Sequence, residues 1–104
     1  MPTIELAWED GCPHVDAARA NLAEALAAFD GPKSWREWRR GDVTAPAYAS
    51  RAGSPAIFVD GRDVEGIDAG AEACCRVYVD KDGRRAFAPA VEVIVSALRR
   101  AHDR

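Results

Sequence analysis

The cysteines are the residues of this sequence best suited to chemistry, and they lie in two places. Cys12 stands alone in the segment GCPH at residues 11–14, whereas Cys74 and Cys75 are adjacent in the second half of the chain. A thiolate is a nucleophile and also a ligand for soft metals. The count of three cysteines is odd, and an odd count does not make a disulfide framework. The pattern therefore predicts reactive, metal-binding or buried thiols.

The residues on either side of Cys12 predict a strand followed by a helix. Residues 3–9 alternate between polar and apolar side chains, as in a half-buried strand whose apolar side carries Ile4, Leu6 and Trp8. From Pro13 onward, apolar residues recur at helical spacing, and they are Val15, Ala18, Leu22, Ala25, Leu26 and Phe29. Pro13 fits the first helical position. Cys12 is therefore expected at a helix N-terminus, where unpaired N–H groups and the helix dipole stabilise a thiolate and lower the pKa of the thiol.

After this helix we expect a strand over residues 34–40 and then a short helix. Trp35 and Trp38 are three residues apart, so they cannot share one face of a regular strand. Thr44 is a suitable N-cap for the short helix, and Gly53 is a suitable C-terminal stop.

The second half of the chain carries the signals of a hairpin and of a last helix. Residues 56–59 are a short apolar β-rich run, and the dipeptide DG at 60–61 is the signal of a tight hairpin into residues 62–65. Residues 66–74 are typical of a loop, and residues 76–87 predict a strand and a turn. A last helix is expected from Pro89 onward. The apolar positions of the last helix are Val91, Ile94, Val95 and Leu98.

The length and the order of these elements predict a single α/β domain over residues 1–104, with a central mixed sheet flanked by helices. The formal net charge is -3, which argues against a nucleic-acid partner. We interpret the interleaved aromatic and basic residues over 34–42 as a strand with one solvated face. No run approaches the roughly 20 apolar residues of a membrane span, and the N-terminal residues lack the pattern of a signal peptide. We therefore expect a cytoplasmic protein with no membrane partner and no resident cofactor.

The order of elements, with a cysteine after the first strand and Ser-Pro before the third, resembles the thioredoxin fold, and glutaredoxin-like proteins in particular. The resemblance covers most of the chain. Its specific marks are GCPH at 11–14 and Gly53-Ser54-Pro55 before AIFVDG. It implies a thioredoxin-like fold in which Pro55 follows a cis peptide bond and lies against the active thiol. It also implies a substrate side formed by Pro13, His14, Ser54 and Pro55, where His14 could add positive charge.

Cys12 departs from the dithiol members of that family because Val15 stands where they carry a second cysteine. A local Cys-x-x-Cys reaction is therefore impossible. Either the protein works as a monothiol, or Cys74 or Cys75 supplies the second sulfur.

The position of the cysteine pair depends on which hairpin forms. If Cys75 opens a strand paired with residues 56–60, it lies at the sheet end opposite Cys12 and cannot form a disulfide with it. If the DG dipeptide instead closes a short hairpin that ends at Gly66, as in glutaredoxin-like proteins, the following loop returns to the Cys12 end. We favour the second arrangement because the DG dipeptide is the stronger local signal.

Residues 73–94, ACCRVYVDKDGRRAFAPAVEVI, also resemble the C-terminal part of alkylmercury lyases. In those enzymes two cysteines bind mercury and an aspartate delivers a proton to the carbon leaving group. The resemblance implies Cys12 and one of Cys74 or Cys75 as mercury ligands, with Asp16 as the acid. Asp16 can equally be a carboxylate that stabilises the first turn of the helix.

The sequence thus predicts a small thiol protein that exchanges disulfides through nucleophilic Cys12, with Cys74 or Cys75 as the resolving thiol. Its partner would be a thiol or disulfide substrate. The alternatives are a binder of mercury or another soft metal, an organomercurial-cleaving enzyme that uses the same cysteines, and a non-catalytic interaction module. The sequence does not indicate the oligomeric state.

Overall fold

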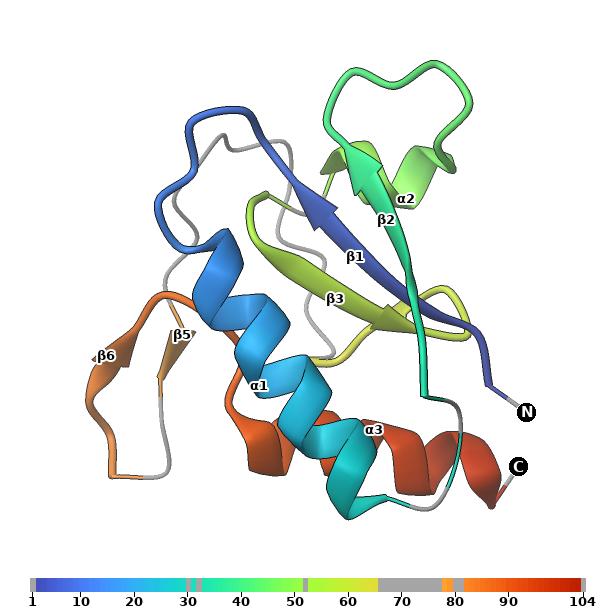
Figure 1. Cartoon of the computed structure of the whole chain (residues 1–104), viewed down its shortest axis with the longest axis vertical. Coiled ribbons are helices and arrows are strands. Elements are labelled where there is room, and N and C mark those ends of the chain that lie inside the picture. Colours follow the sequence, from blue (N-terminus) through green and yellow to red (C-terminus); the bar gives the residue numbers. More distant parts are fainter. Residues whose placement is uncertain are drawn as a thin grey trace.

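A computed structural model of the chain describes residues 2–29, 31, 33–51, 53–65, 78–79 and 82–103. A mixed sheet lies at its centre and has the strand order β2-β1-β3-β4. The strands are β1 (Ile4–Trp8), β2 (Arg36–Arg39), β3 (Ala56–Val59) and β4 (Arg62–Asp63). β1 pairs parallel with β2 and antiparallel with β3, and β3 pairs antiparallel with β4 (Figure 1).

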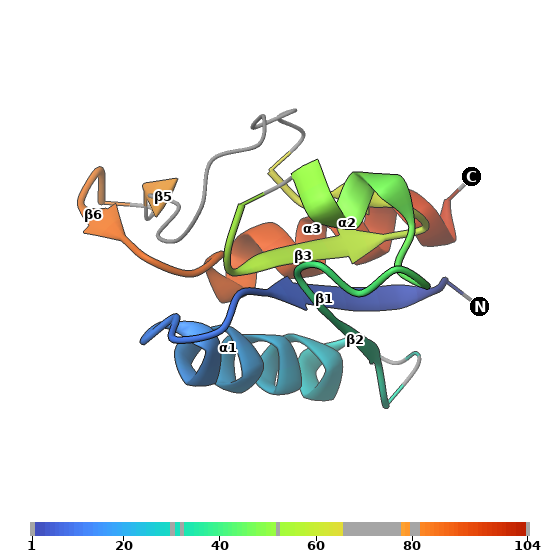
Figure 2. The same ribbon diagram turned by 90° about the horizontal axis from the view of Figure 1, so that it is seen from above.

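Helices lie on both faces of this sheet, as Figure 2 shows for α1 and α2. The helices are α1 (Val15–Ala28), α2 (Ala47–Arg51) and α3 (Val91–His102). A separate hairpin precedes α3 and consists of β5 (Tyr78–Val79) and β6 (Arg85–Ala86). The expected mixed sheet flanked by helices is thus confirmed. No helix among the described residues is long and apolar enough to cross a membrane.

The main core lies between the sheet and the pair α1 and α3. α1 contributes the side chains that its helical spacing predicted, namely Val15, Ala18, Leu22, Ala25 and Leu26. Phe29 is the C-cap of α1 and is half-buried. In α3 the buried residues are Ile94, Ala97 and Leu98, whereas Val91 and Val95 are only partly buried. The amphipathic patterns therefore identified the inner faces of both helices.

The second face of the sheet is also covered, which corrects the expectation that the first strand is half-buried. Ala7, Ala56 and Phe58 pack with Ala49 of α2 to form a smaller core. Glu5 points to this same face and is only 4% exposed. A period of two identifies the two faces of a strand, but it does not reveal that a short helix will cover the polar one.

Trp35 and Trp38 lie on opposite faces of the sheet. Trp35 packs against the main core, and Trp38 packs against the smaller core beside Tyr48. β2 keeps a continuous register with β1 from Arg36 to Arg39. The spacing of three is therefore accommodated without placing both indoles on one side.

The turns near α2 and β3 test the predictions based on short motifs. Asp60 and Gly61 both have positive φ, at 53° and 78°, as the predicted tight hairpin between β3 and β4 requires. Gly53 has a φ of 76° just after α2 and agrees with a C-terminal stop. Thr44 does not cap α2, which begins at Ala47. Its backbone N–H and its hydroxyl instead donate to Asp42 Oδ1, at 2.9 and 2.7 Å, in a turn before the helix.

Candidate functional site

Cys12 lies in the turn between the end of β1 and the start of α1. Its backbone N–H donates to the carbonyl oxygen of Glu9 at 3.1 Å, which closes the turn. Gly11 adopts a φ of 80°, a conformation that a residue with a side chain rarely takes. The Cys12 thiol is reduced and half-buried, and it packs against the main core.

The start of α1 differs from the sequence-based expectation. The helix begins at Val15, with His14 as its N-cap, so Pro13 precedes the cap instead of taking the first helical position. His14 has φ -106° and ψ 4°, which is outside the helical region and delays the helix by two residues. Cys12 therefore belongs to the turn that leads into the helix. The first helical turn, whose N–H groups have no partner within the helix, begins three residues after Cys12, at Val15.

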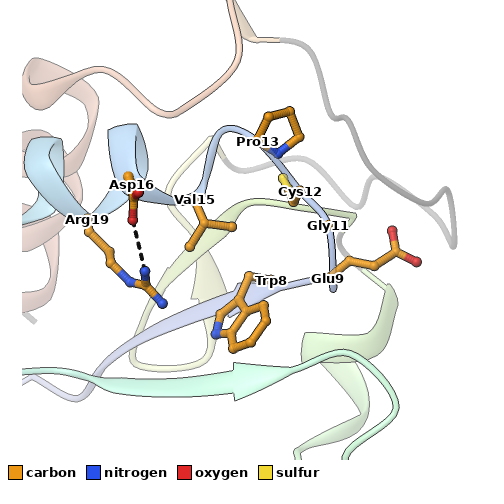
Figure 3. Close-up of a pocket in the computed structure, with 8 residues that line it drawn as sticks. All are labelled: Trp8, Glu9, Gly11, Cys12, Pro13, Val15, Asp16 and Arg19. Carbon is orange, nitrogen blue, oxygen red and sulfur yellow. Dashed lines mark hydrogen bonds and ion pairs between the residues drawn. The ribbon is translucent and has the colours of Figure 1, made fainter.

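A pocket of about 310 Å³ opens beside this turn (Figure 3). Its lining residues are Trp8, Glu9, Gly11, Cys12, Pro13, Val15, Asp16 and Arg19. Figure 3 shows the turn with Cys12 at one side, Trp8 from β1 below it, and Asp16 and Arg19 from α1 opposite. The structure thus brings together three of the residues singled out from the sequence, namely Cys12, Pro13 and Asp16.

Charged side chains form a cluster on the α1 side of the pocket. Arg19 Nη1 donates to Asp16 Oδ1 at 3.0 Å, while its Nε and Nη2 donate to both carboxylate oxygens of Glu37 at 3.0 and 2.8 Å. The hydrogen bond from Arg19 lowers the pKa of the Glu37 carboxyl, and Trp35 adds to this effect. The Arg19 guanidinium also lies 5.9 Å from the centre of the Trp8 ring.

Sequence reasoning missed Arg19, Trp8, Glu9 and Glu37 as members or neighbours of this site. Arg19 had a usable signal, because it lies three residues after Asp16 on the same helix and such pairs commonly interact. Glu37 had none, since its contact with Arg19 depends on how α1 packs across β2.

His14 does not line the pocket. Its ring stacks on Phe87, with 4.5 Å between ring centres and 13° between the ring planes. Phe87 directly follows β6, so this stack ties the β5–β6 hairpin to the turn that carries Cys12. The role of His14 seen in the structure is therefore a packing contact.

Ser54 and Pro55 are not among the residues that line the pocket. Both are fully buried, and the peptide bond between them is cis. Ser54 Oγ accepts the backbone N–H of Glu9 at 3.0 Å, and the carbonyl oxygen of Pro55 accepts the hydroxyl of Tyr78 at 2.5 Å. These two residues thus support the turn from the sheet side and connect it to β5.

Cys74 and Cys75 lie outside the described residues. In the part of the chain that is described, no group of three or more His, Cys, Asp or Glu side chains is arranged to hold a metal ion. The candidate site therefore consists of one thiol in a pocket that also holds an indole, two carboxylates and a guanidinium.

Comparisons with protein-family models, with curated proteins and with solved structures found no significant match to this chain.

Proposed function

We propose that this chain is a thioredoxin-like thiol protein that exchanges disulfides through Cys12. The strand order and directions support the fold assignment, because a parallel β1–β2 pair joined by α1, followed by antiparallel β3 and β4, is the arrangement that the resemblance implies. The cis peptide bond before Pro55 agrees with the same resemblance.

One observation carries the proposed chemistry: the Cys12 thiol lines an open pocket in the turn immediately before a helix of 14 residues. The N-terminus of such a helix stabilises an anion, and the thiolate is the form that attacks disulfides. In the reaction, the Cys12 thiolate forms a bond to one sulfur of the substrate. The substrate S–S bond breaks, and its other half leaves as a thiolate.

The resolving thiol in this proposal is Cys74 or Cys75. Tyr78 follows Cys75 by three residues and is hydrogen-bonded to Pro55, while the neighbouring Ser54 is bonded to Glu9 in the turn that Cys12 closes. Tyr78, which follows the cysteine pair in the sequence, is therefore connected to the end of the sheet that carries Cys12.

The rate of alkylation by iodoacetamide tests the activated thiol. The rate is measured as a function of pH in the Cys74→Ser/Cys75→Ser variant, in which Cys12 is the remaining thiol. We expect the labelling rate of Cys12 to rise with a midpoint below about pH 8.5, the pKa of a model thiol. Cys12→Ser is the control that identifies the signal. A midpoint at or above that value contradicts the proposal.

Mild oxidation followed by peptide mapping tests the second thiol. A Cys12 bridge to Cys74 or Cys75 is the expected product, because a bond between adjacent cysteines has strained geometry. A product that contains only the 74–75 bridge, or none, removes the resolving role and leaves a monothiol protein.

Organomercurial cleavage is a second candidate, favoured by the fact that Cys12 and Asp16 line the same pocket. It requires a protonated acid near the metal, whereas the Asp16 side chain is 94% exposed and ion-paired with Arg19. We therefore expect tight mercury binding with little release of hydrocarbon from an organomercurial. Rapid release that Asp16→Asn abolishes would favour the lyase. If neither reaction is observed, the remaining candidates are a soft-metal binder without turnover and a non-catalytic interaction module.

A further inference from the structure

The charges around the pocket point to the class of substrate that Cys12 accepts. Two of the lining side chains are carboxylates, Glu9 and Asp16, and one is the guanidinium of Arg19. Arg19 is held by both oxygens of Glu37 and by Asp16, so its positive charge faces two carboxylates. The cluster of Asp16, Arg19 and Glu37 therefore carries a net charge of about -1 at neutral pH.

Asp16 is the member of this cluster that meets the substrate. Its side chain is 94% exposed, whereas those of Arg19 and Glu37 are 40% and 29% exposed. The guanidinium also lies over the Trp8 ring, and both side chains line the pocket. An incoming molecule consequently encounters the carboxylate of Asp16 before the charge of Arg19.

We propose that Asp16 is a specificity-determining residue, which makes the pocket favour cationic over anionic thiol or disulfide substrates. This inference rests on the proposed function of Cys12. It gives Asp16 an electrostatic role toward the substrate and no role in proton transfer. Acidic substrates with carboxylates close to the disulfide are correspondingly disfavoured.

The size of the effect follows from the exposure of Asp16. A unit charge several ångströms from a reacting atom in water changes a rate about two- to threefold, and salt screens the interaction over about 10 Å at 0.1 M ionic strength. The selectivity of the pocket is therefore modest in size and is expected to decrease as salt is added.

Methanethiosulfonate reagents provide a test, because cationic, neutral and anionic forms share one leaving group. The Cys12 thiolate bonds to the thio sulfur of the reagent, the S–S bond of the reagent breaks, and methanesulfinate leaves. The full chain with Cys74→Ser and Cys75→Ser is labelled with a trimethylammonioethyl, a hydroxyethyl and a sulfonatoethyl reagent. Each rate is divided by that of a neutral model thiol with the same reagent.

We expect a corrected cationic-to-anionic rate ratio of about four or more at low salt, falling toward one at high salt. Asp16→Asn should lower the ratio about twofold or more, whereas Asp16→Glu should keep it. The matched control is Glu24→Gln, which removes the same charge from the exposed side of α1 about 12 Å farther along the helix. This control should leave the ratio unchanged.

A ratio at or below one in the wild-type pocket overturns the inference, and so does an effect of Asp16→Asn no larger than that of Glu24→Gln. The rate with bis(2-hydroxyethyl) disulfide separates this outcome from failure of the proposed function. If Cys12 does not exchange with that neutral disulfide, disulfide exchange is wrong, but the ratio of the charged reagents still reports the charge selectivity of the pocket.

Discussion

On each face of the sheet a tryptophan donates a hydrogen bond to a glutamate, and the two glutamates differ in their surroundings. On the α2 face, Glu5 accepts the indole N–H of Trp38 and the hydroxyl of Tyr48, both at 2.6 Å. On the α1 face, Glu37 accepts the indole N–H of Trp35 at 2.9 Å and pairs with the guanidinium of Arg19.

The partners decide what each carboxylate can do. Glu5 is almost completely buried and its two oxygens are taken by neutral donors, which connect β1, β2 and α2. Glu37 is half-exposed, and its cationic partner, Arg19, lines the Cys12 pocket. The comparison indicates that the α2 face contributes to stability, whereas the α1 face also places charged groups beside the Cys12 pocket.

The largest effect is expected from removing the acceptor of the α2 face. Glu5→Leu leaves the partly buried indole N–H of Trp38 and hydroxyl of Tyr48 without this acceptor and should lower the free energy of unfolding by about 3 kcal/mol. Glu5→Gln should cost much less, because its amide oxygen can accept from Trp38 and its amide nitrogen can donate to a rotated hydroxyl. Urea unfolding of both variants measures the difference. Equal losses would show that the hydrogen bonds of Glu5 do not stabilise this face.

Tyr48→Phe should lower the free energy of unfolding by a smaller amount, about 1 to 2 kcal/mol, because Glu5 loses one of its two hydrogen-bond donors. Burial, reinforced by Glu5, raises the pKa of Tyr48 to about 12. The folded state thus retains the Tyr48 proton where the unfolded state has lost it, so this stabilisation is complete below pH 10 and is lost as pH rises through about 12. Unfolding measured from pH 9 to 12 should show a weaker alkaline loss in the variant. An unchanged slope would contradict this account.

The smallest change in stability is expected from a substitution on the α1 face. Glu37→Gln should lower the free energy of unfolding by about 1 kcal/mol or less at neutral pH, because both partners of the ion pair are partly exposed. Arg19 lowers the pKa of Glu37 in the folded state. The ionised Glu37 carboxylate therefore contributes to stability at pH values above its ordinary pKa of 4.5, and this contribution is lost as the pH falls through the lower pKa of the folded state. The variant should therefore lose less stability than wild type on acidification. Glu24→Gln serves as the control, and an identical acid slope in wild type and Glu37→Gln would exclude this contribution.

Local signals identified much of the fold. The buried side of α1 follows from apolar residues at helical spacing, because the period of the helix and the period of the pattern coincide. The hairpin between β3 and β4 follows from Asp60 and Gly61, because the turn requires positive φ at both positions. The start of α1 was predicted two residues early, because His14 takes a non-helical backbone conformation that the neighbouring sequence does not signal.

The candidate site was predictable only in part. Cys12 and Asp16 were identified because a thiol before a helix and a carboxylate in its first turn are local features. The charge of the pocket depends on Glu37, which reaches Arg19 only through the packing of α1 on β2.

The sequence by itself determined the position of the thiol between a strand and a helix, because hydrophobic period and turn chemistry act over a few neighbouring residues. Only the tertiary structure decided the roles of the two glutamates. Glu5 and Glu37 both occupy polar positions of strands, yet one is buried by α2 and the other is paired by α1. The physical reason is that burial and charge pairing depend on which helix covers each face of the sheet, and that choice is made by contacts between residues far apart in the chain.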